Sequence, residues 1–142
     1  MTNQEKKQYL NRYQITNKQI DQKCAELAEW RSKATKITPT MSDMPKGNGS
    51  ENRLESAVEK IMEIEEGINA DIDKLLEIHR EILQAIEAVN DPDLCLVLKY
   101  RYINGFTFER VGVEMHYTRQ WVCVLHGRAL KELIVIDTPP VI

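Results

Sequence analysis

Residues 52–90 have the sequence NRLESAVEKIMEIEEGINADIDKLLEIHREILQAIEAVN, and this stretch predicts the fold class. Apolar residues recur in it every seven positions, in a row made of Leu54, Ile61, Ile68, Leu75, Ile82 and Val89. A companion row follows four residues later and consists of Val58, Glu65, Ile72, His79 and Ile86. Because a heptad repeat aligns side chains along one helix face, we expect one long helix that packs like a coiled coil.

A second helix is expected over residues 3–37, which contain no Gly or Pro. Its apolar stripe is thinner and consists of Tyr13, Ile20, Leu27 and Ala34. Residues 38–51 are rich in Pro, Gly, Ser and Asn, and they predict a loop. Two such helices joined by a loop predict an antiparallel hairpin arm over residues 1–90 of an all-α protein.

The charge pattern agrees with this pairing. Residues 1–37 hold 8 Lys/Arg against 4 Asp/Glu, whereas residues 38–91 hold 5 against 13. The basic helix and the acidic helix therefore attract each other. Because the stripe on the acidic helix is the wider one, part of it needs another partner, either the C-terminal region or a second copy in a homodimer formed through residues 52–90.

Several function classes lack their sequence signals. No apolar run approaches the roughly 18 residues needed to span a bilayer, and the N-terminus lacks a signal peptide, so we expect a cytoplasmic protein and no membrane partner. The three Cys and three His residues do not have metal-ligand spacing, and we expect His116 and His126 in a turn or at the surface. No phosphate-binding loop or nucleophile motif is present. We therefore expect no enzyme activity, no metal and no cofactor.

Residues 91–133 predict a compact domain of three short helices, followed by an apolar tail at 134–142. The expected starts, stops and turns of these helices are at Asp91-Pro92, Asn104-Gly105, Thr107, His116-Tyr117 and Thr118. The last two helices are joined by a turn of three to four residues, and Gly112 allows them to approach closely. This layout is typical of a helix-turn-helix.

The last helix, from Arg119 to about Leu133, would then carry the residues that contact double-stranded DNA. Arg119 and Gln120 are candidates for reading guanine and adenine, and Cys123 and Val124 lie on the same outward side. Thr118 and the helix N-terminus can hold a phosphate. Trp121 can stack on nucleic acid or pack on its own domain. Three further residues are candidates for contacts with the DNA backbone: Arg110, Arg128 and Lys131.

The run from Leu98 to Leu133 resembles region 4 of bacterial sigma factors, in the following matches: Arg101-Tyr102, Gly105-Phe106-Thr107, Glu109-Arg110-Val111, Thr118-Arg119, Val122 and Arg128-Ala129-Leu130. His116 stands where that pattern usually has Gly, so we expect some backbone strain there. The whole chain resembles a family of short phage and mobile-element proteins with sigma-like ends. The segments that carry this second resemblance are Ser42-Asp43-Met44-Pro45 and Ile68-Asn69-Ala70-Asp71-Ile72-Asp73.

These resemblances imply a sequence-specific transcriptional regulator of phage or prophage origin, acting in a bacterial host cell, that binds DNA near promoters and contacts RNA polymerase. Two alternatives stay open. A small terminase subunit, which recognises DNA packaging sites, also combines a helix-turn-helix with a coiled coil. An adaptor that binds polymerase or a sigma factor would share the helical pattern without binding DNA.

Overall fold

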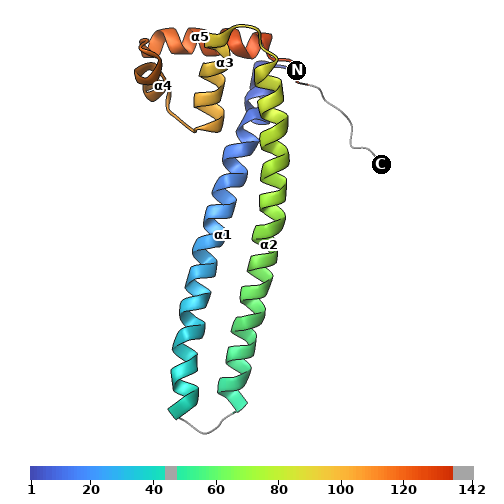
Figure 1. Ribbon diagram of the computed structural model, residues 1–142, viewed down its shortest axis with the longest axis vertical. Helices are drawn as coiled ribbons and strands as arrows, with labels where there is room; N and C mark the ends of the chain where they lie inside the picture. The colour runs from blue at the N-terminus through green and yellow to red at the C-terminus, as the bar shows by residue number, and fades with distance from the viewer. Residues whose placement is uncertain (44–47, 136–142) are drawn as a thin grey trace, which may run out of the picture. The chain divides into compact units, whose positions relative to one another are not determined.

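The computed structural model describes the backbone of residues 1–43 and 48–135 and the side chains of residues 1–37 and 52–135. The described residues are 87% helical and contain no strand, so the predicted all-α class is confirmed. The elements, labelled in Figure 1 except for the π-helical turn η1, are α1 (Asn3–Asp43), α2 (Asn48–Glu87), α3 (Pro92–Leu98), η1 (Lys99–Ile103), α4 (Phe108–Met115) and α5 (Arg119–Glu132). None of the helices in the described ranges has an apolar run that would cross a bilayer.

The chain divides into two compact units, and the division differs from the predicted one. The hairpin unit is Thr16–Lys74, and the head unit combines Met1–Ile15 with Leu75–Ile142. A boundary at residue 90 was expected from the sequence. It lies elsewhere because Leu10, from α1, and Ile82 and Ile86, from α2, are fully buried in the same apolar cluster as the C-terminal helices.

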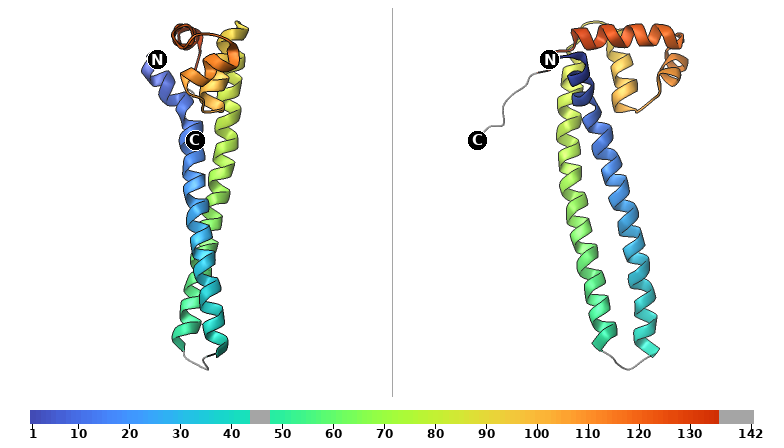
Figure 2. Two further views of the ribbon diagram at one scale, coloured as in Figure 1. Left: turned by 90° about the vertical axis from the view of Figure 1, so that its left-hand side faces the viewer. Right: turned by 180° about the vertical axis from the view of Figure 1, so that it is seen from behind.

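Figures 1 and 2 show that α1 and α2 run antiparallel and side by side in the hairpin unit. Lys23 pairs with Asp71 at 2.6 Å and Arg31 pairs with Glu65 at 2.7 Å, so residues later in α1 meet residues earlier in α2. These two ion pairs link the predicted basic helix to the predicted acidic helix. The buried side chains of the unit are Thr16, Ile20, Ala57, Ile64 and Ile68.

The predicted companion row of the heptads is wrong in this unit. Val58 and Ile72 are 44% and 40% exposed, whereas Ala57 and Ile64 are buried. The second buried row therefore follows the first by three residues rather than four. Both spacings lie on neighbouring sides of one helix, and the position of the partner helix decides between them.

The loop expected at residues 38–51 is also shorter than predicted. Helix α1 continues to Asp43 and α2 begins at Asn48. Extending a helix that is already long costs far less than starting one, so α1 continues past Pro39, although proline removes one backbone donor. Met44 and Pro45 of the quoted phage-type motif, and residues 136–142 of the predicted tail, lie outside the described residues.

The head unit contains the three short helices at the predicted places. Asp91 Oδ1 accepts a hydrogen bond from the backbone N–H of Asp93 at 2.9 Å and so caps α3, where Pro92 is the first residue. η1 ends the first helical run at Ile103, and Gly105 follows with φ of 74°. The side-chain amide of Gln14 donates to the carbonyls of Tyr102 and Ile103 at 3.0 and 2.8 Å, which ties the start of α1 to this turn.

Candidate nucleic-acid interface

Helix α4 begins where the sequence predicts. Thr107 Oγ1 accepts a hydrogen bond from the backbone N–H of Arg110 at 3.1 Å, which satisfies one of the free donors at the helix start. Val111 and Gly112 are buried, and Phe108 and Met115 are partly buried against the same core. The short helix is therefore held on the head by one face, with Glu109, Arg110 and Val113 on its exposed side.

The turn between α4 and α5 is tight, and Gly112 makes it so. A Cβ atom at Gly112 would lie 2.6 Å from the backbone oxygen of Tyr117. The N–H of Tyr117 donates to the Gly112 carbonyl at 2.9 Å, and the Tyr117 hydroxyl donates to Asp93 Oδ2 at 2.7 Å. His116 has φ of 61° and ψ of 40°, the left-handed conformation expected where the sigma pattern has glycine.

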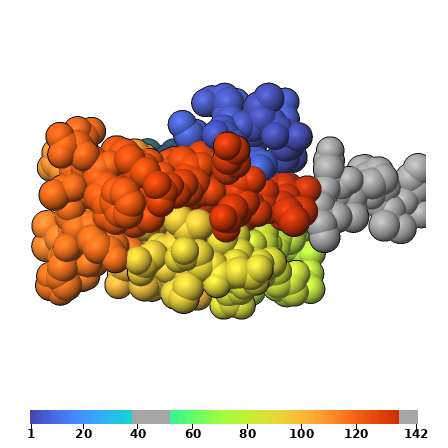
Figure 3. Space-filling view, turned by 90° about the horizontal axis from the view of Figure 1, so that it is seen from above, coloured from blue at the N-terminus to red at the C-terminus, as the bar shows by residue number. Residues whose placement is uncertain are grey.

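Helix α5 is anchored through a face whose four apolar residues the sequence predicts. Val122, Leu125, Ala129 and Leu130 are 5% exposed or less and belong to the apolar cluster of the head. Seen from above in Figure 3, α5 lies across the head, with the first turns of α1 along one side and the end of α2 with α3 along the other. Because the buried face is fixed, the residues on the opposite face are fixed in direction as well.

The predicted DNA-contacting residues on α5 and at its cap are all exposed, away from the buried face. Thr118 Oγ1 accepts from the backbone N–H of Trp121 at 3.1 Å and so caps α5. The next two turns bring together the exposed side chains of Arg119, Gln120, Trp121, Cys123 and Val124. Trp121 is 40% exposed, between the two predicted arrangements: it packs partly on its own domain and keeps part of its indole available.

The basic residues around this face differ in how they are held. The guanidinium of Arg128 lies 5.2 Å from the Trp121 ring centroid, so these two side chains form one exposed pair on α5. Lys131 is exposed one turn further on. Arg110 lies on α4, where its guanidinium stacks over Phe106 at 4.2 Å and pairs with Glu114 at 3.5 Å. Arg128 therefore belongs to the exposed face of α5 with Trp121. The Arg110 side chain is instead occupied by Phe106 and Glu114.

His126 was expected at the surface, and that expectation is wrong. The side chain is buried with 6% exposure, and its Nε2 lies 2.7 Å from the Tyr102 hydroxyl. The Phe108 ring packs edge-on at a centroid distance of 5.0 Å. Burial, reinforced by the positive charges of Lys7 and Arg101, lowers the pKa of His126 to about 4. At neutral pH the imidazole is uncharged, so it links α5 to η1 as a neutral hydrogen-bonding group.

This burial makes the head sensitive to acid. An exposed histidine has a pKa of about 6.5, so between about pH 6.5 and pH 4 the unfolded chain takes up a proton at His126 that the folded chain does not. We expect the free energy of unfolding to fall by up to about 3 kcal/mol over that interval, relative to a variant without this group. Urea unfolding of the protein and of His126→Gln at about pH 7 and about pH 4.5 measures the difference. Equal pH dependence in the two proteins would contradict it.

Sequence reasoning missed the part of α1 that borders α5. Lys6 Nζ donates to the carbonyl of Leu130 at 2.7 Å, across a separation of 124 residues along the chain. Leu10 is fully buried in the same core, with Tyr9 and Tyr13 packed against it. Local patterns cannot reveal such a pairing, because it depends on how distant segments fold together.

The described side chains contain no group of three His, Cys, Asp or Glu residues placed to hold a metal ion. A comparison with known proteins found no matching family model, no similar curated protein and no similar solved structure.

Proposed function

We propose that the protein is a sequence-specific DNA-binding transcriptional regulator of phage or prophage origin that places α5 in the major groove. The observation that carries the proposal is the combination of a capped α5, a tight turn closed on Gly112, and exposed Arg119 and Gln120 in the first turn. Arg suits guanine and Gln suits adenine, each through paired hydrogen bonds. The resemblance of residues 98–133 to sigma region 4 supports the same function and adds RNA polymerase as a proposed partner.

The charge distribution supports a local rather than a general contact with DNA. The net charge is −3, so the chain as a whole does not attract phosphate. The exposed side of α5 nevertheless carries Arg119, Arg128 and Lys131, with Glu132 at its end. We infer that Arg128 and Lys131 contact the DNA backbone while the first turn of α5 contacts bases.

The test is selection from a pool of random DNA duplexes at two salt concentrations, followed by sequencing. We expect a short motif to be enriched by the protein. The double variant Arg119→Ala/Gln120→Ala is expected to keep its helicity and lose the motif, because each paired side chain–base contact contributes about 1–3 kcal/mol of discrimination. Arg128→Gln is expected to weaken binding to all sequences alike and to lower the salt slope by about 1. An unchanged motif in the double variant would refute the assigned reading face.

Exposed apolar side chains on α4 and α5 favour a second candidate function, that of an adaptor that binds a protein. Val113 is 72% exposed on α4, and Trp121 and Val124 are 40% and 44% exposed on α5. Exposed apolar side chains close to a basic helix also suit a protein partner, such as polymerase or a sigma factor. A protein that is not retained on DNA even at low salt, but is retained on polymerase, would establish the adaptor in place of the DNA reader.

The mass in solution separates the remaining alternatives. On the exposed side of α2 in the hairpin unit, Val58, Met62 and Ile72 are 44%, 56% and 40% exposed, and we propose that a second copy of the chain covers them. Analytical ultracentrifugation of a homodimer gives twice the chain mass of 16.5 kDa. A ring of many copies would instead indicate a small terminase subunit, and a monomer would exclude both assemblies.

A further inference from the structure

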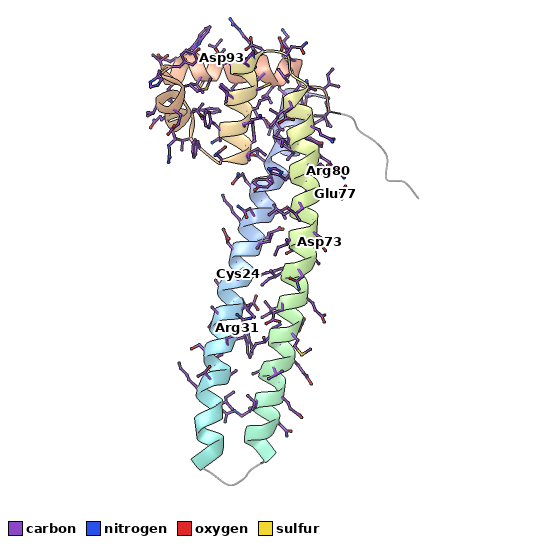
Figure 4. All side chains as sticks on the ribbon, viewed as in Figure 1. Cys24, Arg31, Asp73, Glu77, Arg80 and Asp93 are labelled. Carbon is purple, nitrogen blue, oxygen red and sulfur yellow. The ribbon has the colours of Figure 1, made fainter. Side chains whose placement is uncertain are left out.

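The basic residues of the head unit form two groups, according to whether a carboxylate lies within ion-pair distance. The four that have such a partner are Arg12 with Glu81 at 2.9 Å, Arg80 with Glu77 at 2.8 Å, Lys99 with Glu87 at 3.5 Å and Arg110 with Glu114 at 3.5 Å. Figure 4 labels one of these pairs, Arg80 and Glu77, on α2. The described side chains of the head unit leave six cations without a carboxylate partner: Lys6, Lys7, Arg101, Arg119, Arg128 and Lys131.

Five of these six cations lie on two elements that are side by side. Arg101 is the exception, because it lies on η1 and its guanidinium donates to the Phe106 carbonyl at 2.9 Å. The other five lie on α5 and on the first two turns of α1 (residues 3–10), which border α5 in Figure 3. Lys6 Nζ joins the two elements by donating to the Leu130 carbonyl at 2.7 Å. The cations without carboxylate partners are therefore gathered on one part of the head.

Lys7 lies on the side of α1 that faces the rest of the head. Leu10 follows it by three residues and Gln14 follows Leu10 by four, so the three side chains share one side of the helix. Leu10 is buried in the core of the head, and Gln14 donates to two carbonyls of η1. Burial is the main cause of the low pKa of His126 on α5, and the charge of Lys7 is the next. Both observations place Lys7 close to α5.

The first turns of α1 also change the charge balance of the head. Residues 75–142 hold 7 Lys/Arg against 9 Asp/Glu, whereas residues 1–15 hold 3 against 1. The C-terminal part of the head is therefore acidic without α1. Contacts with phosphate supply most of the sequence-independent affinity of a DNA-binding protein. With only three cations on α5 available for DNA, two more from α1 would add substantially to that affinity.

The length of α5 is compatible with phosphate contacts from its far end. A helix rises about 1.5 Å per residue, so Leu130 lies about 16 Å along the axis from Arg119. The major groove is about 12 Å wide. A helix whose first turn lies in the groove therefore brings its last turns to the DNA backbone at the edge of the groove. Lys6 is attached to α5 at that end.

We propose that the first two turns of α1 belong to the DNA interface, where Lys6 and Lys7 bind backbone phosphates beside the groove that α5 occupies. This inference rests on the proposed DNA-binding function and assigns part of the sequence-independent affinity to a segment outside the helix-turn-helix. The Lys6 ammonium has three protons to donate. One stays on the Leu130 carbonyl and fixes the side chain, and two are left for phosphate oxygens.

The test is the salt dependence of binding to a labelled duplex that carries the selected motif, measured with the full-length protein by fluorescence anisotropy. The double variant Lys6→Gln/Lys7→Gln is expected to bind about 10-fold more weakly at about 0.1 M salt. The logarithmic slope of its binding constant against salt concentration is expected to be smaller by about 2, because two phosphate contacts are lost. The motif that it selects is expected to stay the same, since α5 is unchanged.

Two matched variants separate phosphate contact from net charge and from folding. Lys18→Gln/Lys74→Gln removes the same charge from two exposed lysines of the hairpin unit that have no carboxylate partner among the described residues. Its salt slope is expected to change by less than about 0.5. Lys6→Arg/Lys7→Arg keeps both charges and is expected to keep the original slope. If Lys6→Gln disturbs the fold, as thermal unfolding would show, Lys7→Gln alone is expected to lower the slope by about 1.

Failure of this inference can be distinguished from failure of the proposed function. If the original protein binds its motif and both Lys6→Gln/Lys7→Gln and Lys7→Gln keep its affinity and slope, α1 lies outside the interface and only the inference is overturned. The two lysines would then be left for an acidic protein partner. Equal loss in the two glutamine double variants would show a general effect of charge and would also overturn it. An original protein that no duplex retains at low salt would refute the DNA-binding function and this inference with it.

Discussion

Replacing Leu10 with alanine is expected to lower the free energy of unfolding of the head unit by about 2–5 kcal/mol. Leu10 lies in the second turn of α1 and has no exposed surface, and its side chain belongs to the cluster that includes Val97, Val122 and Leu130. Truncation removes buried apolar surface and leaves a cavity that close-packed neighbours fill only in part. The result would show that the trihelical segment needs α1 for its core.

The measurement is chemical unfolding followed by Trp121 fluorescence in a Trp30→Phe background, because Trp121 is then the only tryptophan and lies in the head unit. Ile15→Ala is the matched control. Ile15 is on the same helix and is 54% exposed, so its truncation is expected to cost about 0.5 kcal/mol or less. A head that unfolds at the same denaturant concentration with and without the Leu10→Ala substitution would contradict the role of α1.

Replacing Gly112 with alanine is expected to destabilise the head by about 2–3 kcal/mol and to weaken the proposed DNA binding in proportion to the loss of folded protein. The new Cβ would lie 2.6 Å from the Tyr117 oxygen, which is a backbone atom and cannot rotate away. Moving Tyr117 would strain its hydrogen bonds to Gly112 and Asp93. The geometry thus leaves no inexpensive relaxation at this turn.

Gly127→Ala is the control for this substitution. Gly127 lies in α5, and a Cβ there meets no atom within 4 Å. Alanine is the better helix former by about 1 kcal/mol, so this variant is expected to be as stable as the original or slightly more so. Thermal unfolding of the two variants compares their stabilities. Similar melting temperatures for Gly112→Ala and Gly127→Ala would show that the turn tolerates a wider separation of α4 and α5.

The candidate interface was predictable from sequence because its signals are local. Thr107 and Thr118 cap the helices that they were expected to cap, and the buried face of α5 follows its apolar spacing. Gly112 and His116 stand at the two turn positions where backbone geometry restricts the side chain. Each of these signals acts over a few residues, where hydrogen-bonding rules and side-chain spacing suffice.

The burial of His126 was not predictable in the same way. The sequence of α5 has no heptad pattern that assigns His126 to the buried face. Tyr102 and Phe108, from other elements of the head, give it a hydrogen-bond partner and an apolar environment. The companion row on α2 failed for the same reason. Ala57 and Val58 are consecutive in the sequence and point to different sides of the helix, and the position of the partner helix determines that Ala57 is the buried one.

The sequence by itself determined the all-α class, the antiparallel pairing of a basic with an acidic helix, and the capped helix-turn-helix with Arg119 and Gln120 exposed on it. Only the tertiary structure decided where the two units divide and that Leu10 and Gln14 complete the head. The physical reason is the separation along the chain over which each kind of signal acts. Helix periods and caps depend on neighbours within one or two turns, whereas cores depend on segments that meet only after the chain has folded.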